Sequence, residues 1–173
     1  MNLIRIDKDN MVNGPGIRQV LWFSSCSHHC PGCHNPETWD PNCGHLFTEE
    51  DKEKIFNLCD NDYTSGITLT GGDPFHPNNR EELAEFASEF EARFPGQTIW
   101  CWTGYNIQNI LNEELLQYID VLIDGKFDKE QRELDLQREN STELLQYRGS
   151  SNQRIIDVQK TLKNNSVVLY DPK

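Results

Sequence analysis

The sequence from residue 17 to residue 35 reads IRQVLWFSSCSHHCPGCHN, with Cys26, Cys30 and Cys33 in its second half. The first part of this stretch, Ile17–Phe23, is rich in β-branched, aromatic and aliphatic residues, which is typical of a strand. The part that follows is small and polar and carries three thiols. The stretch therefore predicts a strand that ends in a cysteine-rich loop.

Further short strands are predicted to alternate with helices along the rest of the chain. The additional strand candidates are Leu3–Ile6, Ile67–Thr70, Thr98–Trp102, Val121–Ile123 and Val167–Tyr170. Helices are predicted to begin at Thr48, where Thr48 and Asp51 resemble a capping box, and at Asn79. A shorter helix is expected within residues 112–118. Residues 126–147 are polar and weakly periodic, so we expect a surface helix and an irregular loop there.

Strands separated by helices indicate an α/β fold with right-handed βαβ units and a parallel sheet. A closed eight-unit barrel takes about 250 residues, or roughly 31 per unit. The 173 residues of this chain supply about five or six such units. We therefore expect one domain, residues 1–173, built as an open partial (β/α) barrel.

Composition excludes several classes of function. The chain has 16 Lys and Arg against 28 Asp and Glu, a net charge of −12, so it lacks the basic surface that nucleic-acid binding needs. No apolar run approaches the roughly 18 residues of a membrane span, and residues 1–14 contain no signal-peptide core. Six cysteines are too few for a disulfide scaffold. We expect a cytoplasmic protein with reduced thiols and no membrane or nucleic-acid partner.

The three cysteines of the loop have the spacing C-x3-C-x2-C. Three thiols cannot all pair with one another, and Pro31-Gly32 favours a turn that would curl the loop around one centre. Thiolates select zinc or iron–sulfur clusters. A cluster normally takes four thiolates, so three would leave one iron open for another ligand. The alternative is a structural zinc site formed by Cys30, Cys33, Cys43 and His45.

Other segments carry a recognisable pattern. They are NGPGIR at 13–18, CHNPETW at 33–39, TLTGGDP at 68–74, WTGY at 102–105, IDGKF at 123–127 and RGSSNQR at 148–154. Together with the cysteine loop, they resemble the radical S-adenosylmethionine (SAM) superfamily. Within it the chain is similar to the glycyl-radical activating enzymes, and most of all to those that activate anaerobic (class III) ribonucleoside-triphosphate reductases. Two residues depart from the usual patterns: Asn13 replaces Asp, and Asp73 stands where the superfamily usually has Glu.

The resemblance implies a radical SAM type of barrel and a [4Fe–4S] cluster held by Cys26, Cys30 and Cys33, with SAM on the fourth iron. It implies reductive cleavage of SAM to a 5′-deoxyadenosyl radical, which abstracts hydrogen from a glycine of the partner. That partner would be the catalytic subunit of an anaerobic ribonucleoside-triphosphate reductase. Electrons would come from a reduced donor such as flavodoxin.

The remaining site candidates follow predicted strands, whose carboxyl ends should meet at one mouth. Gly32 would let the backbone approach the cluster and SAM. His34 would hydrogen-bond SAM or a cluster sulfur, or else be an exposed loop residue. Gly71 and Gly72 would present free backbone groups to SAM, and Asp73 would pair with its ammonium, or else complete a tight turn.

Thr103, Asp124 and Lys126 are further candidates for SAM contacts. Cys59 and Cys101 are expected to be buried hydrophobic residues. Arg148–Arg154 would border the site or contact the partner. Two other functions stay open: activation of another glycyl-radical enzyme such as pyruvate formate-lyase, and a non-enzymatic, zinc-stabilised interaction module.

Overall fold

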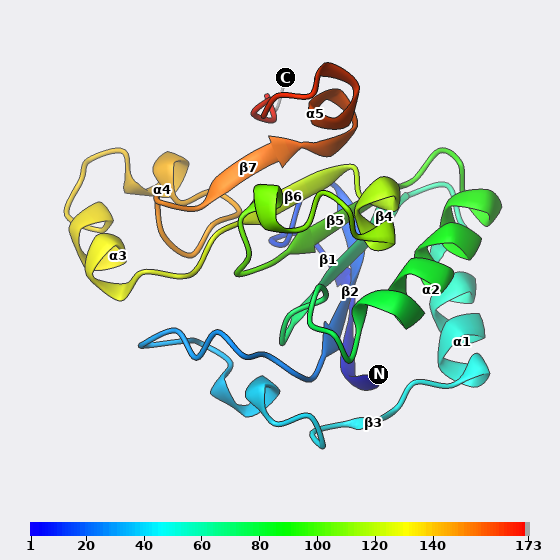
Figure 1. The fold of residues 1–173 in the computed structure, drawn as a ribbon. Coiled ribbons are helices and arrows are strands. Elements are labelled where there is room, and N and C mark those ends of the chain that lie inside the picture. The colour runs from blue at the N-terminus through cyan, green and yellow to red at the C-terminus, as the bar shows by residue number, and fades with distance from the viewer. Residues whose placement is uncertain (172–173) are drawn as a thin grey trace.

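Seven strands form one open sheet, in the order β3-β1-β2-β4-β5-β6-β7, in the computed structural model, which describes residues 1–171 (Figure 1). The strands are β1 (Asn2–Asn10), β2 (Ile17–Phe23), β3 (His45–Leu46), β4 (Thr64–Gly71), β5 (Thr98–Trp102), β6 (Val121–Asp124) and β7 (Arg154–Asp157). The central strands β2, β4, β5 and β6 are parallel to one another. On the two sides, β1 pairs antiparallel with β2, and β7 pairs antiparallel with β6. The sheet does not close on itself.

The α/β class and the open sheet are confirmed, but the predicted five or six parallel units are wrong. Within residues 1–171 the parallel run contains four strands. The candidate Leu3–Ile6 lies in the antiparallel β1, and Val167–Tyr170 contributes only a bridge between Leu169 and Ile156. The loop after β2 and the segment between β6 and β7 take up the chain length that further units would need.

The helices and helical turns occupy the connections between strands. They are η1 (Pro36–Trp39), α1 (Glu49–Cys59), α2 (Arg80–Arg93), η2 (Ile107–Asn109), η3 (Glu114–Tyr118), α3 (Lys129–Asp135), α4 (Ser141–Leu144) and α5 (Val158–Asn164). The predicted helix starts at Thr48 and Asn79 are confirmed, whereas the third candidate is a 3-10 turn, η3. Within residues 1–171, no helix combines the length and the apolar character that crossing a membrane requires.

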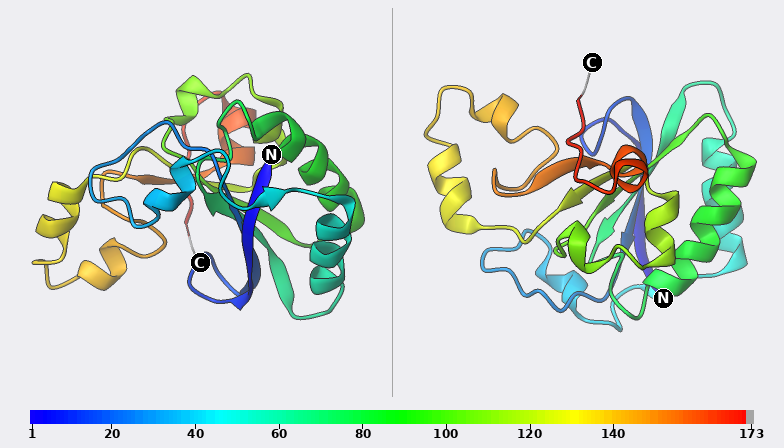
Figure 2. Two further views of the ribbon diagram at one scale, coloured as in Figure 1. Left: turned by 90° about the horizontal axis from the view of Figure 1, so that it is seen from below. Right: turned by 45° about the horizontal axis from the view of Figure 1, so that its top comes forward.

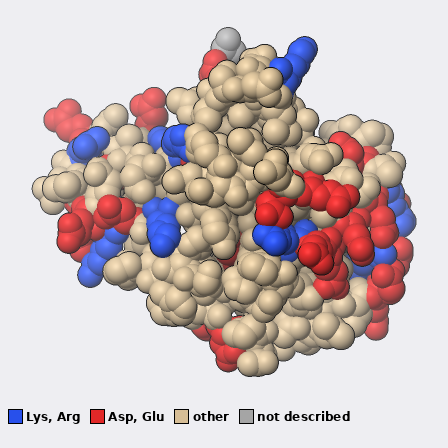
Figure 3. Space-filling view, viewed as in Figure 1, with Lys and Arg blue, Asp and Glu red and all other residues tan. Residues whose placement is uncertain are grey.

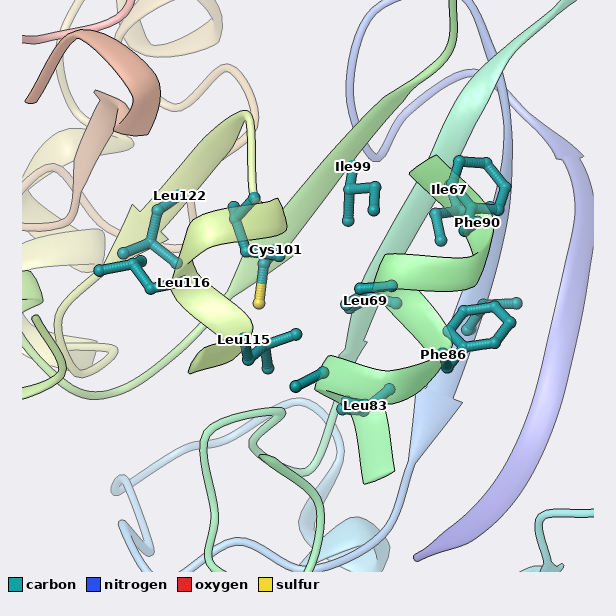
Figure 4. Packing of buried hydrophobic residues seen from close by; sticks show 14 of the residues in the cluster. Ile67, Leu69, Leu83, Phe86, Phe90, Ile99, Cys101, Leu115, Leu116 and Leu122 are labelled. Atoms are coloured by element: carbon teal, nitrogen blue, oxygen red, sulfur yellow. The ribbon is translucent and has the colours of Figure 1, made fainter. Parts of the chain in front are cut away.

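Helices α1 and α2 pack together on one face of the sheet and bury most of the core (Figure 2). Alternate strand residues point toward these helices, as the twofold period of a strand requires. Figure 4 shows the contact between the strands, α2 and η3, with Ile67, Leu69, Ile99, Cys101 and Leu122 from the sheet facing Leu83, Phe86, Phe90, Leu115 and Leu116. This core fixes the strand ends that carry the candidate site.

The opposite face of the sheet carries aromatic rings and a buried cation. Trp100, Val121 and Ile123 form a second apolar cluster, on which Tyr147 packs. Arg18 of β2 is fully buried on this face, with its guanidinium 5.6 Å from the Trp100 ring centre. The sheet therefore has one conventional apolar face and one face that combines indole rings with polar groups.

The first helix depends on a reciprocal cap. The Thr48 hydroxyl accepts a hydrogen bond from the Asp51 backbone N–H, and the Asp51 carboxylate accepts one from the Thr48 backbone N–H. Replacing Thr48 with Ala should lower the free energy of unfolding by about 1 kcal/mol, the usual value of such a cap. Urea unfolding of Thr48→Ala, Asp51→Ala and the double variant would measure it. Additive losses in the double variant would contradict a reciprocal cap.

Candidate functional site

A cavity of about 420 Å³ lies at the carboxyl ends of β2, β4 and β5. On one side it is lined by the loop after β2, here called the cysteine loop (residues 24–35). On the other side it is lined by the segment between β6 and β7, here called the lobe (residues 126–153), which contains α3 and α4. Both segments extend from the same side of the sheet (Figures 1 and 2). The convergence predicted for the strand ends is therefore present.

The cavity brings together most of the residues predicted for the site. Those that line it are Cys26, Cys30, Cys33, His34, Gly71, Gly72 and Asp73. Gly32 lies just outside, against the lobe, where an added Cβ would come within 2.9 Å of Lys129 Cδ. Gly32 thus allows the cysteine loop to approach α3 closely.

The cysteine loop curls through three residues with left-handed backbone. Their φ angles are 70° at Ser25, 48° at His29 and 73° at Gly32. A turn joins the last two cysteines, since the Cys33 N–H donates to the Cys30 carbonyl at 3.0 Å. The predicted Pro31-Gly32 turn is therefore confirmed, and the loop has the curvature needed to present its thiols on one side.

Two of the three thiols in the loop, those of Cys26 and Cys30, favour the protonated form. Burial raises the pKa of Cys26 to about 11, and burial also raises the pKa of Cys30. Because metals bind the thiolate, any metal centre here must displace these protons as it forms.

The arrangement does not assemble the alternative zinc site. Cys43 and His45 lie outside the cavity, and the His45 Nε2 is 2.9 Å from an Asp51 carboxylate oxygen. Across residues 1–171, no three His, Cys, Asp or Glu side chains are grouped closely enough to hold a single metal ion. An iron–sulfur cluster does not require its ligands to converge on one atom, because each thiolate binds a separate iron atom.

The two glycines after β4 are required by packing. A Cβ on Gly71 would lie 2.5 Å from the Phe23 carbonyl oxygen, and a Cβ on Gly72 would lie 2.5 Å from the Ser25 carbonyl oxygen. Gly71 also has a φ of 106°, a backbone angle that residues other than glycine rarely adopt. The glycines therefore let the end of β4 lie directly against the root of the cysteine loop.

The carboxylate of Asp73 is buried and fully hydrogen-bonded within the protein. Its oxygens accept from the Phe75 N–H at 2.9 Å, the Thr103 hydroxyl at 2.9 Å and the Gly104 N–H at 2.9 Å, and one lies 2.7 Å from His28 Nε2. A carboxylate has about four acceptor positions, and these four donors use them. An ammonium could bind Asp73 only by replacing one of these donors.

Comparison with known proteins identifies the family. A family model described as a 4Fe-4S single cluster domain matches residues 12–156. The chain is 43% identical over 155 residues to the anaerobic ribonucleoside-triphosphate reductase-activating protein of Enterobacteria phage T4, covering 90% of this chain and 93% of that protein. It is 38% identical over 148 residues to the protein of the same name from Escherichia coli (strain K12), covering 83% of this chain and 90% of that protein. The chain belongs to the family of anaerobic ribonucleoside-triphosphate reductase-activating proteins.

Of the further candidates for SAM contacts in this activating protein, only some lie at the cavity. Thr103 lines it, as predicted. Asp124 and Lys126 do not: Asp124 is buried in an ion pair with Arg154, and Lys126 is exposed. Cys59, the last residue of α1, and Cys101 of β5 are buried in the apolar core, as expected.

Sequence reasoning missed several residues of the cavity wall. His28 lies between the first two cysteines, and Arg132 and Tyr147 come from the lobe. Gln153, which also lines the cavity, belongs to the segment Arg148–Arg154 that was expected to border the site or contact the partner. Arg148 also lines the cavity, and its Nε is buried without a hydrogen-bond partner among residues 1–171. The RGSSNQR segment gave a signal for Arg148 and Gln153. His28 could have been singled out by its place within the C-x3-C spacing.

Proposed function

We propose that this activating protein is a radical SAM enzyme that installs a glycyl radical in an anaerobic ribonucleoside-triphosphate reductase. The observation that carries the proposal is the grouping of Cys26, Cys30 and Cys33 around one cavity with the end of β4. Their chemistry fits a cluster, because thiolates are the ligands that iron–sulfur clusters take. Three of them leave one iron for SAM.

The role proposed for each residue follows from its position at the cavity. Cys26, Cys30 and Cys33 hold the [4Fe–4S] cluster. His34, whose ring centre is 5.4 Å from that of Phe127, lies at the cavity wall and would contact SAM or a cluster sulfur. When bound, the cluster would supply the electron for cleavage of SAM to methionine and a 5′-deoxyadenosyl radical, the species that would abstract hydrogen from the partner's glycine.

The remaining proposed contacts to SAM come from the strand end and the turn of the loop. The Gly72 N–H already donates to the Phe23 carbonyl at 2.7 Å, and the Gly71 carbonyl accepts from the Thr38 hydroxyl at 3.0 Å. These two glycines would therefore contact SAM chiefly through carbonyl oxygens, which can each accept a second hydrogen bond, and Gly32 would keep the loop close to the lobe. Asp73 would receive the ammonium in exchange for one of its present donors. Among residues 1–171, two cationic side chains line the cavity, those of Arg132 and Arg148. They favour the binding of anionic groups there, although the chain as a whole has a net charge of −12.

The distribution of surface charge supports a protein substrate. Acidic side chains gather over α1 and α2, whereas the surface around the cysteine loop is largely uncharged (Figure 3). Between Ser24 and Gly44 only Glu37 and Asp40 are acidic. We propose that the reductase subunit covers this uncharged side and excludes water and oxygen, with a reduced donor such as flavodoxin supplying electrons. We further propose a single domain over residues 1–173, a radical SAM type of open barrel and a cytoplasmic location.

Anaerobic assays test this function directly. Protein reconstituted with iron and sulfide should be brown and, with dithionite, should convert SAM to 5′-deoxyadenosine. Adding the anaerobic reductase subunit should produce the electron paramagnetic resonance (EPR) signal of a glycyl radical. A signal with pyruvate formate-lyase in place of the reductase would assign the alternative partner. A colourless protein that binds only zinc would refute the proposal.

A further inference from the structure

His28 is joined to the ends of two strands, although it belongs to the cysteine loop. Its Nε2 lies 2.7 Å from an Asp73 carboxylate oxygen, and the His28 and Asp73 side chains are only 9% and 2% exposed. The same carboxylate accepts from the Thr103 hydroxyl and the Gly104 N–H after β5. Through Asp73, His28 therefore links the cysteine loop to both β4 and β5.

The space around the imidazole is fitted to it. The His28 ring lies edge-on to Tyr105, with ring centres 4.5 Å apart. A Cβ on Gly104 would come within 2.3 Å of His28 Cδ2, so Gly104 leaves room for the ring. A side chain held by a short polar contact and by two neighbouring residues has a single well-defined position.

His28 and Asn79 hold two different parts of the cysteine loop. His28 lies two residues from Cys26 and two from Cys30, so a shift of its backbone must also displace the chain next to both thiols. The root of the loop is fixed separately: the buried Asn79 amide donates to the Ser24 carbonyl at 2.7 Å and to the Asp73 carbonyl at 2.9 Å. Asn79 thus anchors the start of the loop, and His28 anchors the segment between the first two cysteines.

We infer that His28 is a positioning residue for the cluster, holding the Cys26–Cys30 segment against the strand ends through Asp73. The inference rests on the proposed cluster site and adds a role for a side chain that is not itself a ligand. It also gives Asp73 a role, because its carboxylate orients the imidazole. Residues that orient metal ligands in this way typically change metal affinity by about 10–100-fold when replaced.

The test compares three variants during anaerobic reconstitution with limiting iron and sulfide. His28→Leu removes the donor, whereas His28→Gln keeps an N–H donor at a similar reach. Ser27→Ala is the matched control, because Ser27 is the exposed residue directly before His28 and lies outside the cavity. The readouts are iron and sulfide bound per chain, and the EPR spectrum of the dithionite-reduced cluster.

We expect His28→Leu to bind the cluster about 10–100-fold more weakly and to show an altered spectrum. His28→Gln should recover most of the binding, and Ser27→Ala should match the wild type. Wild-type binding and spectrum in His28→Leu would overturn the inference. Equal loss in a folded His28→Gln, checked by thermal unfolding of the ligand-free proteins, would overturn it too. A wild-type chain that binds no cluster would instead refute the proposed function.

Discussion

Replacing Cys30 with Ala is expected to abolish cluster binding and, with it, cleavage of SAM. Cys30 is the middle cysteine of the loop, and its carbonyl accepts the turn-forming hydrogen bond from Cys33. Loss of one of three thiolates leaves two, too few to hold a cluster that normally takes four ligands. Iron analysis after anaerobic reconstitution and 5′-deoxyadenosine formation with dithionite would measure the effect, and Cys26→Ala and Cys33→Ala should behave alike.

Cys43→Ala is the matched control for this experiment. Cys43 is also half-buried in a loop, but it lies outside the cavity. Its replacement should leave iron content and SAM cleavage near wild-type levels. A full cluster in Cys30→Ala, or loss of the metal in Cys43→Ala, would speak against the three-cysteine assignment, and the latter result would favour the zinc alternative.

Replacing Arg18 with Met should cause the largest loss of stability. Its guanidinium donates to the hydroxyls of Thr68 and Thr98 at 3.0 Å each, and to the carbonyls of Ile67 and Thr98 at 2.6 Å each. Burial lowers the pKa of Arg18 to about 10, and the nearby Asp120 acts in the opposite direction. The side chain therefore stays charged at neutral pH, and removing it leaves buried acceptors without a donor. We expect the free energy of unfolding to fall by about 3 kcal/mol or more.

Arg138→Met provides the comparison in the same urea titration. The Arg138 side chain is 52% exposed and lies 4.0 Å from Asp135, and exposed ion pairs contribute about 0–1 kcal/mol. A loss below about 1 kcal/mol in Arg18→Met would show that water or a rearranged side chain can satisfy these buried acceptors.

The order and class of the main elements could be predicted from the sequence because local chemistry determines them. The β-branched runs correctly marked the four parallel strands, and the Thr48 cap correctly marked α1. Strand direction could not be predicted in the same way. Leu3–Ile6 has the composition of a strand, but nothing in that composition distinguishes antiparallel pairing with β2 from a place in the parallel run.

The candidate site was predictable where the residues follow strands and unpredictable where contacts cross the fold. Thr103 and Gly71 reached the cavity because each stands at the carboxyl end of a parallel strand. Asp124 also ends a strand, but the side chain of Arg154 on the antiparallel β7 pairs with it. His28 was missed for the same reason, since its partner Asp73 is 45 residues further along the chain.

The flanks of the sheet have a consequence for how the protein behaves at high concentration. β3 pairs with β1 only at Asn2 and Leu3. Most of the outer edge of β1 therefore presents backbone N–H and C=O groups with which a strand of another molecule could pair. Positive and negative side chains alternate along this edge strand, at Arg5, Asp7, Lys8 and Asp9. Charged side chains on an edge strand discourage pairing with strands of other molecules. Concentrated solutions of the protein should therefore resist fibril-like association, even though the sheet is not closed.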